Sequence, residues 1–296
     1  MNHRHARGTR LPILRAALLA AFLPAGLAVA PPPLAAQAPT PADTTALVEI
    51  VLHDGGVVRA RILSRGDPLR LLLPSGDVLE VAAGRVREIR PLTTGRSVDG
   101  VYWPEDPNRT SLFLGPTART LPQGRGYVGV YELFFPLAGV GVTDWLTLAG
   151  GAPILGELLD EGIFYLAPKL RIPGTGPHVD VAVGALSFFS SDDDFGVGYA
   201  VITAGSRDAA VTAGALLPWY DSELGDEPAF LLGAEARVSR SVKLMTENYV
   251  TSEAALLTFG PRFFGDRLSA DVGVAVVVDD RGFDHVFPII NFLYRW

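Results

Sequence analysis

The sequence predicts an all-β protein in which a small β module precedes an antiparallel transmembrane β-barrel of about twelve strands. The 296-residue chain is 48% hydrophobic and only 19% charged, with a mean hydropathy of +0.27. Beyond the N-terminus, no stretch has the roughly 20 consecutive apolar residues that a transmembrane helix needs. From Phe287 to Trp296, apolar or aromatic residues instead occupy alternate positions, as in a strand with one lipid-facing and one polar side.

The N-terminus, from Met1 to about Ala38, has the features of a secretory signal peptide. An apolar run from Ala16 to Ala30 follows a basic start, and Ala36-Gln37-Ala38 forms a small-residue cleavage site. The competing interpretation, an anchoring helix, is disfavoured because the run is short and contains Pro24. The chain has no cysteine, which excludes a lipoprotein anchor. Residues 39–45 form a linker rich in Pro, Thr and Ala.

Residues 46–91 show a compact all-β pattern of about five short strands. Asp54-Gly55-Gly56 and Pro74-Ser75-Gly76-Asp77 mark tight turns between them. The layout resembles an SH3-like or Sm-like small barrel, a size at which one core is only marginally stable. The basic residues of this module are explained most simply as a solvated strand face. The more specific alternative is contact with an anionic periplasmic polymer or membrane surface. These residues are Arg59, Arg61, Arg65, Arg70, Arg85, Arg87 and Arg90.

Residues 92–109 have few periodic positions and are expected to form a tether, after which residues 110–296 are expected to form the barrel. Alternation and turn residues predict about twelve strands there, an even number as in single-chain membrane barrels. The expected strands are Ser111–Arg119, Gly126–Val142, Trp145–Gly151, Phe164–Ile172, Val179–Phe188, Gly196–Gly205, Ala210–Leu217, Phe230–Val238, Val242–Val250, Ala255–Phe264, Leu268–Val278 and Phe287–Trp296.

A final strand that ends in Tyr294-Arg295-Trp296 resembles the closing strand of bacterial outer-membrane β-barrel proteins. The resemblance covers roughly Thr110 to Trp296 and concerns architecture. It implies that Phe292, Tyr294 and Trp296 belong to a C-terminal assembly signal. It also implies outer-membrane lipid and the outer-membrane assembly machinery as partners, and an N-terminal module in the periplasm.

The lengths of the connections give a second indication. If Trp296 lies at the periplasmic end, the periplasmic turns are short and most of the external loops are longer, as in barrels of this class. Only Thr251–Ala254 is shorter than this pattern predicts. The periplasmic turns would be Thr143-Asp144, Pro173–His178, Ser206–Ala209, Ser239–Ser241 and Gly265–Arg267, and the other external loops Thr120–Arg125, Ala152–Ile163, Phe189–Phe195, Pro218–Ala229 and Asp279–Val286.

Alternation also predicts which charged side chains face the lumen, because a charge near the middle of the lipid face would cost kilocalories. Charges of both signs converge there and nearly balance. A plug of salt bridges filling a narrow lumen is favoured over a polar path or ligand site. The predicted lumen charges are Glu132, Lys169, Arg171, Asp180, Glu235, Arg237, Lys243, Glu247, Arg262, Asp271 and Arg295.

Chemical motifs are sparse, so a non-enzymatic structural, binding or narrow-pore role in the envelope is favoured. The alternatives are a barrel enzyme acting on lipid or peptide, with His285 beside Asp284 as its candidate site, and a soluble periplasmic β-protein that binds an apolar ligand. No cofactor is predicted and no set of residues has metal-ligand spacing; Asp192-Asp193-Asp194 lacks the spaced acids of a calcium loop. The net charge of -7 gives no reason to expect nucleic-acid binding. The sequence does not identify a small-molecule ligand.

Overall fold

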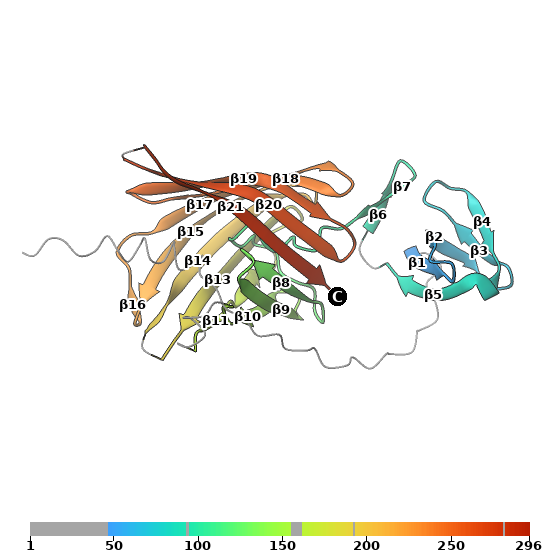
Figure 1. The fold of residues 1–296 in the computed structure, drawn as a ribbon, viewed down its shortest axis with the longest axis horizontal. Helices are drawn as coiled ribbons and strands as arrows, with labels where there is room; N and C mark the ends of the chain where they lie inside the picture. The colour runs from blue at the N-terminus through green and yellow to red at the C-terminus, as the bar shows by residue number, and fades with distance from the viewer. Residues whose placement is uncertain (1–46, 93–94, 155–161, 192, 281) are drawn as a thin grey trace, which may run out of the picture.

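The structure is a computed structural model that describes residues 47–92, 95–154, 162–191, 193–280 and 282–296. The expected signal peptide and the linker of residues 39–45 lie outside these residues. Two β units follow one another along the chain, an N-terminal sheet and a large barrel (Figure 1). No helix in the described part of the chain is both long enough and apolar enough to cross a membrane.

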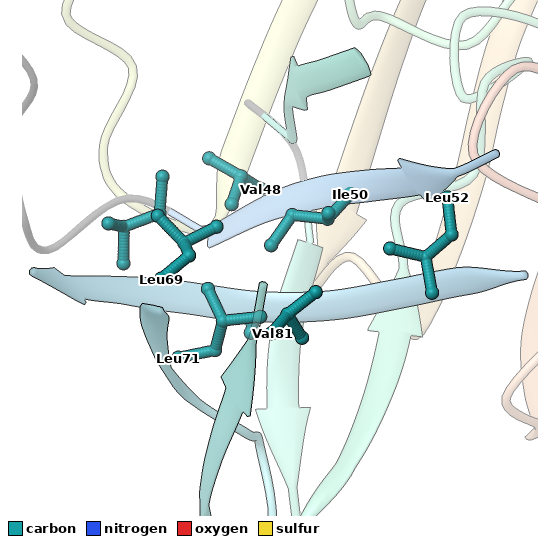
Figure 2. Close-up of a cluster of buried hydrophobic side chains, with 8 residues drawn as sticks. Val48, Ile50, Leu52, Leu69, Leu71 and Val81 are labelled. Atoms are coloured by element: carbon teal, nitrogen blue, oxygen red, sulfur yellow. The ribbon is translucent and has the colours of Figure 1, made fainter. Parts of the chain in front are cut away.

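The N-terminal sheet has five antiparallel strands in the order β4-β3-β2-β1-β5. The turn after β1 forms because Asp54 Oδ1 accepts the Gly56 N–H at 2.8 Å while Gly55 takes a φ of +84°. One face carries a small apolar core that includes Ile50, Leu71 and Val81 (Figure 2). The elements are β1 (Leu47–Leu52), β2 (Val57–Ser64), β3 (Leu69–Leu72), β4 (Val78–Val81), the short 3-10 helix η1 (Ala83–Arg85) and β5 (Val86–Pro91).

The expectation of a closed small barrel in this module is not supported. β4 and β5 lie at opposite edges of the sheet, and no pairing joins them among the described residues. η1 carries the chain from β4 to the far side of β1, where β5 pairs from Val48↔Pro91 to Leu52↔Val86. With edge strands this short the sheet stays open.

The expected tether is partly regular structure. β6 (Gly95–Val98) and β7 (Val101–Pro104) form a hairpin whose turn residues, Asp99 and Gly100, have φ angles of 50° and 74°. Asp-Gly between two valines is a strong signal for such a turn, so the sequence did contain the information. The Trp103 ring faces the guanidinium groups of Arg96 at 5.6 Å and of Arg237 at 4.6 Å.

The barrel is a closed antiparallel sheet of twelve strand positions. β21 pairs with β8 to close it, and β11 and β12 share one position between β10 and β13, while β16 is a short addition to β15. The strands are β8 (Gly126–Tyr131), β9 (Phe135–Thr143), β10 (Leu146–Gly151), β11 (Phe164–Leu166), β12 (Lys169–Ile172), β13 (Val179–Phe189), β14 (Asp194–Gly205), β15 (Ala209–Tyr220), β16 (Glu223–Leu224), β17 (Ala229–Ser239), β18 (Val242–Val250), β19 (Ala254–Phe264), β20 (Leu268–Asp279) and β21 (Gly282–Arg295).

The expected strand number is right because two errors cancel. Ser111–Arg119 is not a strand, and its described backbone makes only the isolated bridge Ser111↔Pro116. Gly126–Val142 is not one strand but the hairpin β8–β9, whose turn uses positive φ angles at Glu132 (51°) and Leu133 (62°). Non-glycine residues rarely adopt such angles, so this turn could not be predicted from the residues at these positions.

The two faces of the barrel wall follow the predicted alternation. On β17, Phe230 and Leu232 each point outward with 56% of their surface exposed, whereas Leu231 and Glu235 point inward and are buried. Other outward side chains include Ile202, Leu257, Phe259 and Val272. A continuous apolar outer face of this kind is the surface that a lipid bilayer covers.

The end of the barrel that holds Trp296 is here named the Trp296 end, and the other the opposite end. Connections at the Trp296 end are short: 144–145, 173–178, 206–208, 240–241 and 265–267. At the opposite end only 152–163 and 221–228 are long, because strands extend into the expected loops and leave 190–193, 251–253 and 280–281. The expected external loop Thr120–Arg125 instead lies at the Trp296 end, where Thr120 Oγ1 donates to the Asp144 carbonyl at 2.8 Å. The expected contrast in loop length is therefore weaker than the sequence indicated.

Candidate functional site: a barrel lumen closed by its own chain

The lumen contains residues 105–121, here named the plug segment, which connect the β6–β7 hairpin to β8. The segment enters from the Trp296 end and returns to it, with its tip at Leu112–Gly115. Most of it is buried although it belongs to no strand, because the barrel wall surrounds it. Its buried residues include Asp106, Asn108, Thr110, Leu112, Phe113, Thr117, Ala118 and Leu121.

The tip packs on apolar patches of the inner wall. Leu112 lies with Ala182, Val201 and Leu231, and Phe113 lies with Met245 and Ile289. Glycine on the wall makes room for it: a Cβ at Gly233 would overlap the Leu112 side chain, and one at Gly273 would lie 3.1 Å from Phe113 Cε1. The wall and the plug segment thus have matching shapes.

Arg262 on β19 is the central anchor of the plug segment. Its guanidinium is fully buried and makes a two-point ion pair with Asp271 on β20, at 2.6 and 2.9 Å. It also donates to the main-chain oxygens of Asn108 (2.6 Å), Ser111 (3.1 Å) and Leu112 (2.8 Å). All five N–H donors of the side chain therefore have acceptors, most of them on the plug segment.

A second set of contacts joins the base of the plug segment to the wall. Asp106 lies between Lys243 Nζ at 3.0 Å and Arg262 Nη1 at 3.3 Å. Lys243 also pairs with Glu235 at 2.9 Å, and Glu235 pairs in turn with Arg119 at the other end of the segment. These groups are almost completely buried, so each charge depends on its partners to offset the cost of leaving water.

Side chains of the wall also satisfy the backbone of the plug tip. Glu247 accepts the N–H groups of Leu114 (3.0 Å) and Gly115 (2.8 Å). Asn291 donates to the Phe113 carbonyl at 2.8 Å, and Lys169 donates to the Thr110 and Thr117 carbonyls at 2.6 and 3.1 Å. A loop without strand pairing needs such partners when it is buried.

The remaining predicted lumen charges lie elsewhere. Arg295 faces Glu105 at 3.5 Å near the Trp296 end. Arg237 pairs with Asp208 at 3.4 Å, and Arg171 with Asp180 at 3.3 Å, both at this rim. Glu132 lies apart from the others, in the β8–β9 turn, where its backbone N–H donates to Asn291 Oδ1 at 2.9 Å.

An open cavity of about 560 Å³ lies at the Trp296 end, between the plug segment and the turns. Arginine is the most frequent residue in its lining, but all four arginines pair with carboxylates. Arg109 and Arg207 pair with Glu105, Arg119 pairs with Glu235, and Arg171 pairs with Asp180. Its lining residues are Arg109, Arg119, Thr120, Pro122, Asp144, Arg171, Pro177, His178, Asp180, Gly205, Ser206 and Arg207. The cavity is therefore closer to charge balance than its arginine content indicates.

The other candidates from the sequence are placed as follows. Phe292 and Tyr294 point outward on β21, and the Trp296 ring occupies the space that a Cβ at Gly126 would need. His285 lies exposed on β21. Among the described residues, no group of three or more His, Asp or Glu side chains could hold a metal ion.

Sequence reasoning found most wall residues of this site but missed the plug segment. Its acidic base, Glu105 and Asp106, lies within the expected tether, and its tip lies within the expected strand Ser111–Arg119. The residues of Ser111-Leu112-Phe113-Leu114 give no signal that separates a buried loop from a strand, since the tip contacts polar and apolar wall residues in turn.

No family model and no curated protein matches the chain. Among solved structures, it is similar to a KdgM porin in complex with disordered oligogalacturonate, with 8% identity and a TM-score of 0.44, over 57% of this chain and 96% of that chain. A second KdgM porin structure has 8% identity and a TM-score of 0.42, over 57% of this chain and 96% of that chain. A loop L8 deletion mutant of OmpT, an outer membrane protein of Vibrio cholerae, has 11% identity and a TM-score of 0.32, over 84% of this chain and 96% of that chain. At these identities and TM-scores the likenesses carry no argument about what this chain does.

Proposed function

We propose that this chain is a non-enzymatic outer-membrane protein whose barrel is closed to ions and anchors the N-terminal sheet on the periplasmic side. The observation that carries the proposal is the plug segment, held in the lumen by Arg262, Lys243 and Glu247. A barrel with such a filled lumen serves as a membrane anchor rather than as an open pore.

The position of the sheet supports the anchoring role. Arg59 on β2 pairs with Asp266 in the β19–β20 turn at 2.9 Å, and Tyr102 on β7 donates to the same carboxylate at 2.5 Å. Arg96 on β6 pairs with Asp208 in the β14–β15 turn. Arg59 therefore docks the sheet directly on the Trp296 end, and Tyr102 and Arg96 dock the β6–β7 hairpin there. The family resemblance places this end in the periplasm.

The sheet also offers a surface for a partner. Arg61, Arg65 and Arg87 are exposed and have no ion pair among the described residues, so they remain available to an anionic polymer or headgroup. A binding module held at the inner face of the outer membrane could contact such a partner without any transport through the barrel.

The test is ion conductance in planar lipid bilayers. The wild-type protein should show no steady current, whereas a variant in which a short Gly/Ser linker replaces residues 110–118 should show stepwise conductance. Heat-modifiable migration on gels verifies that the variant barrel is folded. A steady wild-type current as large as that of the linker variant would overturn the closed-lumen proposal, and recovery of the mature chain as a detergent-free soluble protein would overturn the membrane placement.

A further inference from the structure

Among the described residues, strand pairing in the barrel wall is interrupted beside β21, and this interruption is here named the gap. β21 has 14 residues, but β8 has only 6 and pairs with it solely from Phe292 to Arg295. From Asn291 toward Gly282, no described strand pairs with β21 on its β8 side. Figure 1 shows β8 and β9 confined to the part of the barrel near the C-terminus, with β21 continuing far past them.

The free edge of β21 is built so that it does not take up another strand. The mutual bonds between Trp296 and Gly126 show that alternate residues of β21 direct their N–H groups toward β8. At the next such positions beyond the pairing, Ile290 donates its N–H to the Glu132 carboxylate and Pro288 has none to donate. Proline and an inward-turned charge are common means of protecting an edge from strand addition. A second copy of the chain is therefore a poor occupant for this gap.

Beyond Glu132, the lumen behind the gap is lined by aromatic and aliphatic side chains. Four aromatic rings on β9, β11, β13 and β14 follow one another around the inner wall: Phe135 to Tyr165 at 6.2 Å, Tyr165 to Phe188 at 5.4 Å, and Phe188 to Phe195 at 5.0 Å between centroids. Phe287 on β21 and Val277 on β20 pack with the plug tip.

These side chains are not fully covered. Phe188, Phe195, Val277 and Phe287 are half-buried although they share the inward side of their strands with fully buried residues such as Ala182 and Ile289. No charged residue occupies the inward positions of β13 and β14 from Gly184 to Phe188 and from Phe195 to Tyr199. We name this region the aromatic vestibule; its floor is the plug tip.

We propose that the aromatic vestibule binds one acyl chain of a membrane lipid, which enters sideways through the gap beside β21. The outward residues along the gap, such as Val286 with 66% of its surface exposed, face the bilayer, so hydrocarbon chains adjoin the opening. Water in a space lined by aromatic rings is disfavoured, and an acyl chain can replace it without any polar partner. The protection of the β21 edge works against the addition of a β-strand but not against the entry of a flexible acyl chain.

The test uses tryptophan fluorescence in bilayers of phosphatidylcholine with brominated acyl chains, which quench nearby indoles. Trp145 and Trp219 are first changed to phenylalanine, and the signal of the remaining Trp103 and Trp296, measured in this parent variant, is subtracted. Phe188→Trp then reports the vestibule, its neighbour Phe189→Trp reports the lipid face, and Leu231→Trp, buried under the plug segment, reports quenching through a closed wall. The proposal expects Phe188→Trp to be quenched within about twofold of Phe189→Trp, and several-fold more than Leu231→Trp.

Three outcomes would overturn the proposal. The first is quenching of Phe188→Trp by the brominated lipid that is no greater than that of Leu231→Trp. The second is strong quenching of Phe188→Trp by aqueous iodide. The third is a dimer, cross-linked through β21, in which the brominated lipid no longer quenches Phe188→Trp. A second measurement does not depend on fluorescence: native mass spectrometry should find one retained phospholipid on the wild type. Val197→Trp, which fills the vestibule, should lose that lipid, and the outward control Ala200→Trp should keep it. Equal retention by both variants would also overturn the proposal.

Discussion

Replacing Arg262 with alanine should destabilise the barrel more than any exposed substitution. The change removes the guanidinium that pairs with Asp271, a residue with 1% of its surface exposed, and that holds three plug carbonyls. Breaking a buried ion pair by removing one partner costs about 3–5 kcal/mol, because the other charge stays buried. Asp106 keeps Lys243 at 3.0 Å, so the loss should not exceed this range by much.

Two further variants separate charge from geometry. Arg262→Lys keeps the charge but has a compact ammonium with three donors in place of the planar fork, so it should lose about 2 kcal/mol. Ala234→Leu lies on the outward side of β17 and should change stability by no more than about 0.5 kcal/mol.

The assay is urea unfolding of the barrel in lipid vesicles, followed by intrinsic fluorescence and by heat-modifiable migration. The reasoning would be refuted if the free energy of unfolding of Arg262→Ala fell within about 0.5 kcal/mol of that of Ala234→Leu. If Arg262→Ala left stability unchanged but let ions pass through the membrane, the wild-type Arg262 would be the lining of a pore and not an anchor of the plug segment.

The remaining predictions concern the plug tip, the rim and the seam. Gly115→Ala should loosen the tip and raise protease cleavage within residues 105–121, because the new Cβ would overlap the Tyr249 hydroxyl; Gly84→Ala, where the Cβ meets open space, is the control. Burial and the hydrogen bond to Asp266 raise the pKa of Tyr102 above its usual 10.0, so its contribution to docking is present below pH 10 and is lost as pH rises above it. Protease release of the sheet should show this alkaline step in the wild type but not in Tyr102→Phe. Removing Trp296 should impair assembly, and Gly126→Val, which would overlap the Trp296 ring, should weaken the seam; normal folding yield of Gly126→Val in vesicles would show that the ring does not stabilise the seam. Protease added to intact cells should leave the sheet uncut until the outer membrane is permeabilised, and cleavage in intact cells would contradict a periplasmic sheet.

The sequence predicted the wall because the wall obeys a local rule. A lipid-facing residue must alternate with an inward one along each strand, and β17 to β21 follow this at nearly every position. Charged residues at inward positions, such as Glu235, Lys243 and Arg262, could thus be assigned to the lumen from parity alone. Their partners could not, because an inward direction does not say what fills the space.

The plug segment escaped prediction for a physical reason. A buried loop needs polar partners for its backbone and apolar contacts for its side chains, and Ser111 to Arg119 meets both needs with a mixed pattern like that of a strand. Gly115-Pro116, a dipeptide typical of turns, is the one local signal against a continuous strand there. The position of the short hairpin β8–β9 was also hidden, since its turn depends on Glu132 and Leu133 adopting positive φ angles that neither residue favours.

The path of the chain constrains how the lumen could ever open. On its C-terminal side the plug segment runs into β8, which is fixed by the mutual bonds between Gly126 and Trp296. On its N-terminal side it runs into β7, whose contacts with the rim, such as Tyr102 to Asp266, are few and partly exposed. Withdrawal must therefore start from the N-terminal side. A partner of the sheet can favour the open state only by the difference in its affinity for the docked and released sheets. Under the closed-lumen proposal, that difference would have to exceed the cost of separating Asp106 from Lys243 and the plug carbonyls from Arg262.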